Sequence, residues 1–401
     1  MAPGAFPAAR IVAPRIEVHF ARQLRPRRMK GDARVAFPPD AAAIEAMVDA
    51  AFWASLRREE NYLPRISLAF LPPEQTIHPF CFHRPLPLGA AALARLAPAV
   101  ERPGVHVGVW RLDGALKVWG TTRVIPDFCF VLEVAAPGLL VVKHRQGDQS
   151  GKFVNVAVIE GDSIKVVDER ASSLPDCPPV LASMLGFDSP ASWVNSVNVL
   201  VQLAVSMRAH GRGGVLLVVP AGSETWRESI VGPVPYALNP AHVELGELMA
   251  QRDQKKPLPE LSTANHPLRR ESDFSAGQRV QAWREALDSS VSAIAGLTAV
   301  DGAAVMTTGY HLLAFGAKIV RRKGRPQVER VTVTEPVEGD EAAVVEPPAL
   351  GGTRHLYAAQ FVQDQHDALA LVASQDGRFT VFAWSPCDEM VHAHRVETLL
   401  L

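Results

Sequence analysis

The stretch GGTRHLYAAQF, from Gly351 to Phe361, places two glycines, a hydroxyl, a guanidinium and an imidazole directly before an apolar pattern typical of a helix. The first amides of a helix lack intrahelical partners and carry partial positive charge, and glycines let the backbone close around an anion. Thr353, Arg354 and His355 could each contact phosphate there, and His355 could instead bind a metal. The alternative is a helix that Thr353 caps, with Arg354 in an ordinary ion pair.

Two further stretches combine turn-forming residues with a polar side chain. VDGAAV places Asp301 and Gly302 at a strand entrance, where the carboxylate could hold a divalent metal or a ribose hydroxyl. The alternative there is a turn that merely opens the strand. SQDG, from Ser374 to Gly377, is typical of a hairpin turn in which Asp and Gly supply the required dihedrals. That turn gains weight as a binding site only if it faces the other two stretches.

The order of these stretches resembles the nucleotide-binding domain of the diadenylate cyclase (DAC) family, which makes cyclic di-AMP from two ATP molecules. The resemblance covers residues 189–388, with an insertion at about 220–275. It rests on a helix followed by GGVLLVVP, and on DGAAVMTTGYHLLAFGAKI, GGTRHLYAAQF and DALALVASQDG. It implies an α/β domain with a mixed β-sheet flanked by helices. The nucleotide-binding residues that it implies are Asp301, Gly302, Ala303, Gly352, Thr353, Arg354, His355 and Ser374.

The resemblance also implies roles for these side chains. In the family, the aspartate and the histidine are associated with the metal and the reacting ribose, while the threonine, arginines and serine hold the triphosphate. Asp301 and His355 would accordingly be catalytic if the protein is an active cyclase. The same two residues would hold Mg²⁺ or Mn²⁺ if a nucleoside triphosphate is bound.

The sequence departs from the family pattern at two places. The last residue of the family's Arg-His-Arg triplet is Leu356 here, and its serine followed by two acidic residues reads Ser374, Gln375, Asp376. A charge-assisted phosphate contact is worth about 1.5–3 kcal/mol, so its loss would slow a cyclase roughly ten- to a hundredfold. Binding could persist without it. The pattern is therefore most similar to divergent DAC-like domains proposed as nucleotide sensors, the DACNV type.

The N-terminal half has a different texture and carries no chemical motif. Residues 1–39, rich in Pro, Arg and Ala, are predicted to form an irregular arm. Asp40 is predicted to cap a helix over 40–60. Six Val- and Ile-rich runs between 104 and 169 predict a largely antiparallel sheet. We therefore expect an N-terminal strand-rich α/β domain at 40–185, of unassigned role, before the DAC-like domain at 189–388 and a C-terminal tail at 389–401.

The second half is expected to alternate helices and strands. VLLVVP (215–220) is a short, wholly apolar run, as in a buried central strand. Helices are predicted at 189–214, 244–250 and 275–300, and the polar, Pro-interrupted segment 251–274 is predicted to be a loop.

Composition and charge exclude several classes of protein. The 401 residues exceed one ordinary core, which favours two domains. A formal net charge of −1 provides no general attraction for nucleic acid or an acidic membrane, and we expect neither as a partner. Four cysteines without a CxxC pair argue against a disulfide scaffold or a structural zinc site. No run approaches the roughly 18 apolar residues of a membrane span, so a cytoplasmic location is expected.

The remaining motifs have simpler local explanations. HPFCFH (His78 to His83) brings two histidines and a cysteine together, but an intervening proline and the lack of a second cluster favour an ordinary strand or turn. HAHR (His392 to Arg395) is interpreted as exposed decoration near the C-terminus, and HGRGGV (210–215) as a helix end. No Walker A, GxSxG, HExxH or dinucleotide GxGxxG pattern occurs.

The leading interpretation is a sensor that binds a nucleotide or cyclic dinucleotide and acts on a second copy of the chain or on an effector protein. One alternative is an active diadenylate cyclase, whose chemistry needs two domains face to face. The other is a non-catalytic structural interaction module.

Overall fold

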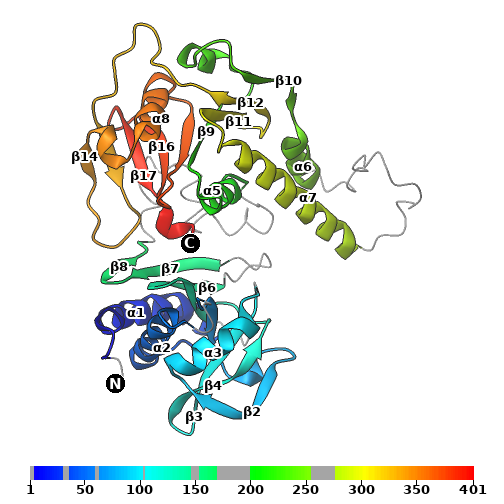
Figure 1. Ribbon diagram of the computed structural model, residues 1–401, viewed down its shortest axis with the longest axis vertical. Coiled ribbons are helices and arrows are strands. Elements are labelled where there is room, and N and C mark those ends of the chain that lie inside the picture. The colour runs from blue at the N-terminus through cyan, green and yellow to red at the C-terminus, as the bar shows by residue number, and fades with distance from the viewer. Residues whose placement is uncertain are drawn as a thin grey trace.

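The computed structural model describes residues 4–29, 36–58, 63–102, 104–145, 153–168, 199–253 and 276–401. It arranges them as two α/β units, each built on one mixed sheet (Figure 1). The predicted α/β class, with a mixed sheet flanked by helices in the C-terminal unit and a strand-rich N-terminal unit, is confirmed. The predictions for 169–198 and for residues 254–274 of the loop predicted at 251–274 lie outside the described residues, whereas residues 251–253 are helical and continue the helix Glu244–Asp253.

The N-terminal sheet has eight strands in the order β2-β4-β3-β1-β5-β6-β7-β8. The six predicted runs form β3 to β8, and β1 and β2 are additional strands. β2 contains two prolines, which an edge strand tolerates because its outer amides need no partner. The bounds are β1 (Ile66–Phe70), β2 (Phe80–Pro87), β3 (His106–Leu112), β4 (Ala115–Thr122), β5 (Phe130–Ala136), β6 (Leu139–Arg145), β7 (Phe153–Glu160) and β8 (Ser163–Val166).

Three helices, α1 (Pro7–Met29), α2 (Ala41–Ser55) and α3 (Ala90–Val100), contribute to the core on one face of this sheet. Asp40 caps α2 as predicted, because its carboxylate accepts a hydrogen bond of 2.8 Å from the Ala43 amide. The predicted irregular arm at 1–39 is wrong over 7–29, which form α1. Its apolar stripe, which includes Ile16 and Phe20, is buried in the core, and that burial outweighs the unfavourable Pro14 inside the helix.

The C-terminal sheet has nine strands in the order β10-β12-β11-β9-β15-β16-β17-β13-β14. Its strands are β9 (Gly214–Val219), β10 (Tyr236–His242), β11 (Ala303–Thr307), β12 (Leu312–Ala317), β13 (Val331–Thr334), β14 (Ala343–Val345), β15 (Leu369–Ala373), β16 (Phe379–Ser385) and β17 (Met390–Arg395). Its helices are α5 (Val199–Ala209), α6 (Glu244–Asp253), α7 (Ala276–Leu297) and α8 (Thr353–Asp364).

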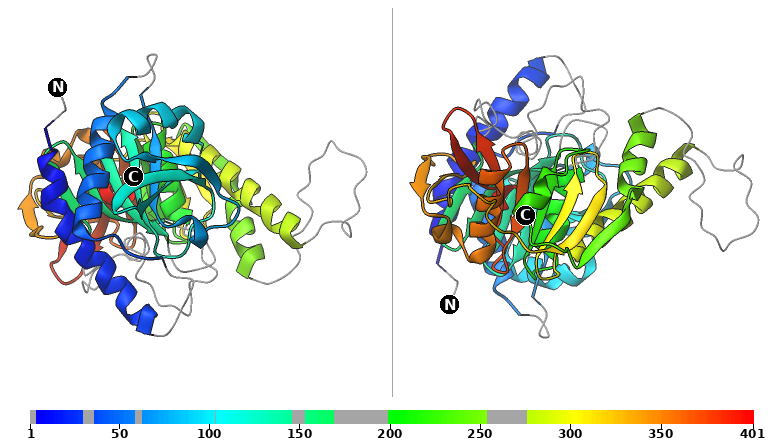
Figure 2. Two further views of the ribbon diagram at one scale, coloured as in Figure 1. Left: turned by 90° about the horizontal axis from the view of Figure 1, so that it is seen from below. Right: turned by 90° about the horizontal axis from the view of Figure 1, so that it is seen from above.

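The central strand β9 is buried along its whole length, as its apolar sequence predicts. Its alternate side chains serve two cores. Leu216 and Val218 pack in the core that includes α5 and α7, whereas Val215 and Leu217 pack in the core that includes α8. Helices therefore cover both faces of this sheet, and α8 is fixed on one of them (Figure 2).

The predicted C-terminal tail is also wrong, because residues 390–395 form β17 between β16 and β13. HAHR is thus part of the sheet and not exposed decoration. His394 is buried, and its Nδ1 lies 2.8 Å from the Thr334 hydroxyl. Ala393 and His394 are consecutive, so they lie on opposite faces of the sheet, and both are buried because both faces of this sheet are covered.

The two units meet along β7 and β8 of the N-terminal sheet, beside the end of the C-terminal unit (Figure 1). Asn155 donates a hydrogen bond of 2.9 Å to the Thr398 carbonyl. Lys165 forms an ion pair with Glu335, with Nζ and Oε1 2.6 Å apart. A β-bridge between Val167 and the C-terminal unit extends the junction.

Candidate functional site

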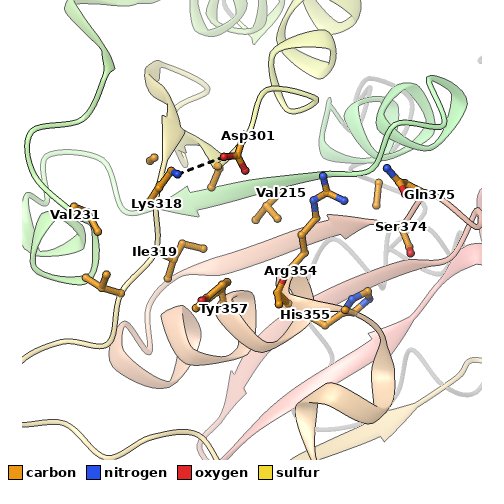
Figure 3. A pocket seen from close by; sticks show the side chains of 17 residues that line it. Val215, Val231, Asp301, Lys318, Ile319, Arg354, His355, Tyr357, Ser374 and Gln375 are labelled. Atoms are coloured by element: carbon orange, nitrogen blue, oxygen red, sulfur yellow. Dashed lines mark ion pairs between the residues drawn. The ribbon is translucent and has the colours of Figure 1, made fainter.

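A pocket of about 720 Å³ opens at the edge of the C-terminal sheet where β9 and β11 begin and where β12 and β15 end (Figure 3). The size falls within the range of small-molecule sites, roughly 300–1,000 Å³. All eight residues predicted to bind a nucleotide line it, although they come from three separate stretches. They are Asp301, Gly302, Ala303, Gly352, Thr353, Arg354, His355 and Ser374.

The start of α8 forms one wall of the pocket. Gly352 is the N-cap residue, and no side chain caps the helix there. Thr353 is the first helical residue, so it does not act as the cap, and its hydroxyl belongs to an exposed residue on the pocket wall. The uncapped amides and the helix dipole therefore favour an anion at this point.

Arg354 extends along the pocket toward the turn that precedes β9 (Figure 3). Within the described parts of the chain, no carboxylate lies within ion-pair distance of its guanidinium. Gly213, with a φ of +70°, makes room for it, since a Cβ there would lie 2.7 Å from Arg354 Nη1. The two alternatives considered for this stretch were a helix cap by Thr353 and an ordinary ion pair of Arg354. Neither is present among the described residues.

His355 is held in the wall of the pocket with only 2% of its surface exposed. Burial lowers the pKa of its imidazole, so the ring is neutral near pH 7. Its Nε2 has no hydrogen-bond partner among the described residues. The ring packs on Gly351, where a Cβ would approach Nδ1 to 2.4 Å. The glycine thus fixes the position of an uncharged imidazole.

Asp301 and Lys318 form an ion pair at the rim of the pocket, with Oδ2 and Nζ 3.4 Å apart (Figure 3). Their side chains are 91% and 65% exposed, so the pair is weak and easily separated by a ligand. Lys318 was not among the residues predicted from the sequence to line the site. The sequence feature that could have indicated it is its position: Lys318 directly follows β12, at the end of the strand that borders the pocket.

The predicted SQDG turn connects β15 to β16, and Gly377 has a φ of +85°. The Ser374 amide donates to the Arg378 carbonyl at 2.9 Å. Partial burial would raise the pKa of Asp376, but the hydrogen bond from the Ser374 hydroxyl and other contacts outweigh burial and lower it. Ser374 faces the pocket together with Gln375, as the binding interpretation of this turn requires.

The opposite end of the pocket is apolar. Val231, Ile319 and Tyr357 lie there, away from Ser374 and Gln375 (Figure 3). Tyr357 is 48% exposed and offers its ring to the pocket. Polar groups thus gather at one end and apolar groups at the other, which suits a ligand with a charged part and a flat apolar part.

The residues present would hold a divalent metal only with help from a ligand. Among the described residues, no group of three or more His, Cys, Asp or Glu side chains could hold a metal ion. Asp301 and His355 lie at different places on the pocket wall (Figure 3). Mg²⁺ can be held by one carboxylate together with phosphate oxygens and water, and Asp301 offers that one carboxylate.

A comparison with protein-family models finds a match within the N-terminal unit. The model of the family described as "Probable sensor domain DACNV" matches residues 33–123, which contain α2, β1, β2, α3, β3 and β4. The match supports the sensor-domain type expected from the sequence, but it lies in the unit to which no family had been assigned. The link to diadenylate cyclases stays a prediction.

No curated protein matches the chain. Across the described residues, every helix is too short or too polar to cross a membrane.

Proposed function

We propose that the protein is a sensor whose C-terminal unit binds a nucleotide or cyclic dinucleotide. One observation carries the proposal. Three stretches that are far apart in the sequence bring an uncapped helix start, a guanidinium, a hydroxyl and a carboxylate to one pocket. The family match to a probable sensor domain supports the sensor role of the chain.

The pocket suggests how each part of the ligand is held. Phosphate binds at the start of α8, where Thr353, Arg354 and Ser374 supply donors beside the free amides. The Asp301 carboxylate accepts hydrogen bonds from ribose hydroxyls at the rim. The base lies at the apolar end against Tyr357. If the ligand is a nucleoside triphosphate, Mg²⁺ or Mn²⁺ accompanies its phosphates beside Asp301.

Binding without efficient turnover is favoured by the position of Leu356. This residue, which replaces an arginine of the family pattern, packs against the core under α8 and is absent from the pocket lining. The second phosphate fork that the family resemblance implies at this helix start is therefore missing. The described lining includes one arginine, which suits an anion site but supports a cyclase transition state less well.

The experiment is a screen of the full chain against ATP, AMP, cyclic di-AMP and other cyclic dinucleotides, by thermal unfolding and by mass spectrometry of the products. A sensor shows stabilisation of about 2.7 kcal/mol at a hundredfold excess over Kd, and no product. Conversion of ATP with Mg²⁺ to cyclic di-AMP, lost in Asp301→Asn, would identify an active cyclase instead. Neither stabilisation nor product across the panel would leave the structural interaction module.

A further inference from the structure

The two units of the chain share one connectivity over seven strands. Numbered within each unit, and leaving β8, β13 and β14 aside, the strands lie in the order second, fourth, third, first, fifth, sixth, seventh. The first and third strands are parallel in both sheets. The helices agree as well: α2 packs on α3 and β5, and α5 packs on α7 and β15. α2 and α5 precede the first strand, and α3 and α7 precede the third.

The sheets also share an irregularity, in the pairing of the second strand with the fourth. In both, a step of five residues along the edge strand faces a step of two along its neighbour. The flanking pairs are Cys81↔Gly120 and Leu86↔Val118 in the N-terminal sheet, and Ala237↔Ala314 and His242↔Leu312 in the C-terminal sheet. Bulges tend to be kept within a family of folds, so this coincidence is more specific than strand order alone.

This irregularity aligns the other strands residue by residue. Gly120 pairs with Gly108 on β3, as Ala314 pairs with Val305 on β11. The pairing of β3 with β1, compared with that of β11 with β9, then makes Leu68 on β1 the counterpart of Leu216 on β9. The counterparts that follow for the pocket are Ser67 for Val215, Gly104 for Asp301, His106 for Ala303 and Ala135 for Ser374.

The N-terminal counterpart of the pocket lacks the groups that would hold an anion. Gly104 provides no carboxylate where Asp301 stands, and Ala135 provides no hydroxyl where Ser374 stands. Residues 123–129 connect β4 to β5 without a helix, so the counterpart of α8 and its arginine is missing. Trp119, Ile125 and Cys129 instead form the small core on that face.

Side chains also fill the corresponding space. The Ser67 hydroxyl and Nδ1 of His106 are 2.7 Å apart, and His106 is buried. In the C-terminal unit the same positions carry Val215 and Ala303, which line the open pocket. In the N-terminal unit, the hydrogen-bonded pair Ser67 and His106 therefore occupies the positions that line the pocket in the C-terminal unit.

We propose that the N-terminal unit is a second copy of the C-terminal fold without an anion site, so that the chain binds a single ligand, in its C-terminal copy. This inference rests on the proposed function of the pocket. The sensor-domain match at 33–123 then marks the copy that does not hold the ligand.

The test measures binding to the full chain by native mass spectrometry and calorimetry, with cyclic di-AMP and with ATP plus Mg²⁺ as probes. One ligand per chain is expected, with affinity at least about tenfold weaker in Arg354→Ala. Arg123→Ala is the matched control, because Arg123 is the exposed counterpart of Lys318 in the N-terminal copy, and it should leave affinity unchanged. Hydrogen exchange should show ligand protection at 301–303 and 353–355 but not at 104–106.

Two results would overturn the single-site inference while leaving the proposed function intact. These are two ligands per chain, or binding that survives Arg354→Ala and is lost in Arg123→Ala. If neither these probes nor the wider nucleotide panel bind the wild-type chain, the proposed function fails and the single-site inference fails with it.

Discussion

Under the proposed function, replacing Arg354 with alanine removes the side chain on which phosphate binding is expected to depend most. Since no described carboxylate pairs with the guanidinium, its removal leaves no unpaired acid, and the melting temperature without ligand should change little. A charge-assisted contact with phosphate is worth about 1.5–3 kcal/mol, which corresponds to a roughly 10- to 150-fold loss of affinity. Arg354→Lys keeps the charge but loses the fork, so its loss should be intermediate.

Isothermal titration with the tightest nucleotide of the screen measures the effect. Arg378→Ala is the matched control, because it removes the same charge from a neighbouring residue that pairs with Asp376 at 3.3 Å and lies outside the pocket lining. Its effect should stay within about 1 kcal/mol, as for an exposed ion pair. Equal losses in Arg354→Ala and Arg378→Ala would refute direct contact and indicate only a general charge effect.

Three further predictions follow from the geometry. Gly213→Ala should weaken ligand binding because a Cβ would displace Arg354, whereas Gly324→Ala, which has a similar φ of +81° but open space around it, should cost stability alone. Calorimetry that gave the two variants equal affinity would contradict this. Lys318→Ala should weaken binding by about 1 kcal/mol or less, measured by the same titration, because its amine is exposed; a loss above a hundredfold would instead make it a principal ligand contact. Burial lowers the pKa of His106 and of His394 to about 4, so stability is full above pH 6.5 and is lost as pH falls toward 4. Each histidine contributes up to about 3 kcal/mol to the free energy of unfolding. Urea unfolding at pH 7 and at pH 4.5 measures how much of that free energy is lost in acid. A His394→Gln variant that lost as much as the wild type would argue against the assignment.

The sequence was informative wherever local pattern decides structure. Runs of Val and Ile identified β3 to β8, a wholly apolar run identified β9, and Asp40 marked the start of α2. GGTRHLYAAQF and SQDG were correctly expected to form a helix start and a hairpin turn. Their meeting in one pocket was anticipated through resemblance to a family, not through local pattern.

What local pattern could not supply depends on contacts between distant residues. Pro14 argued against α1, but burial of its apolar stripe decided the outcome. HAHR resembled a polar tail because the partners of β17 lie far away in the sequence. The common fold of the two units was hidden because it resides in pairing and register, while equivalent positions carry unlike residues such as Ser67 and Val215.

The buried imidazole of His355 also determines how the site responds to acidity. Because burial lowers the pKa of His355, its positive charge appears at a lower pH than that of an exposed histidine, beside the helix start at which we propose that phosphate binds. An exposed histidine in that place would strengthen anion binding each time the surrounding pH fell below about 6.5. If the proposed function holds, anion binding at this site should depend less on pH than it would with an exposed histidine in that place.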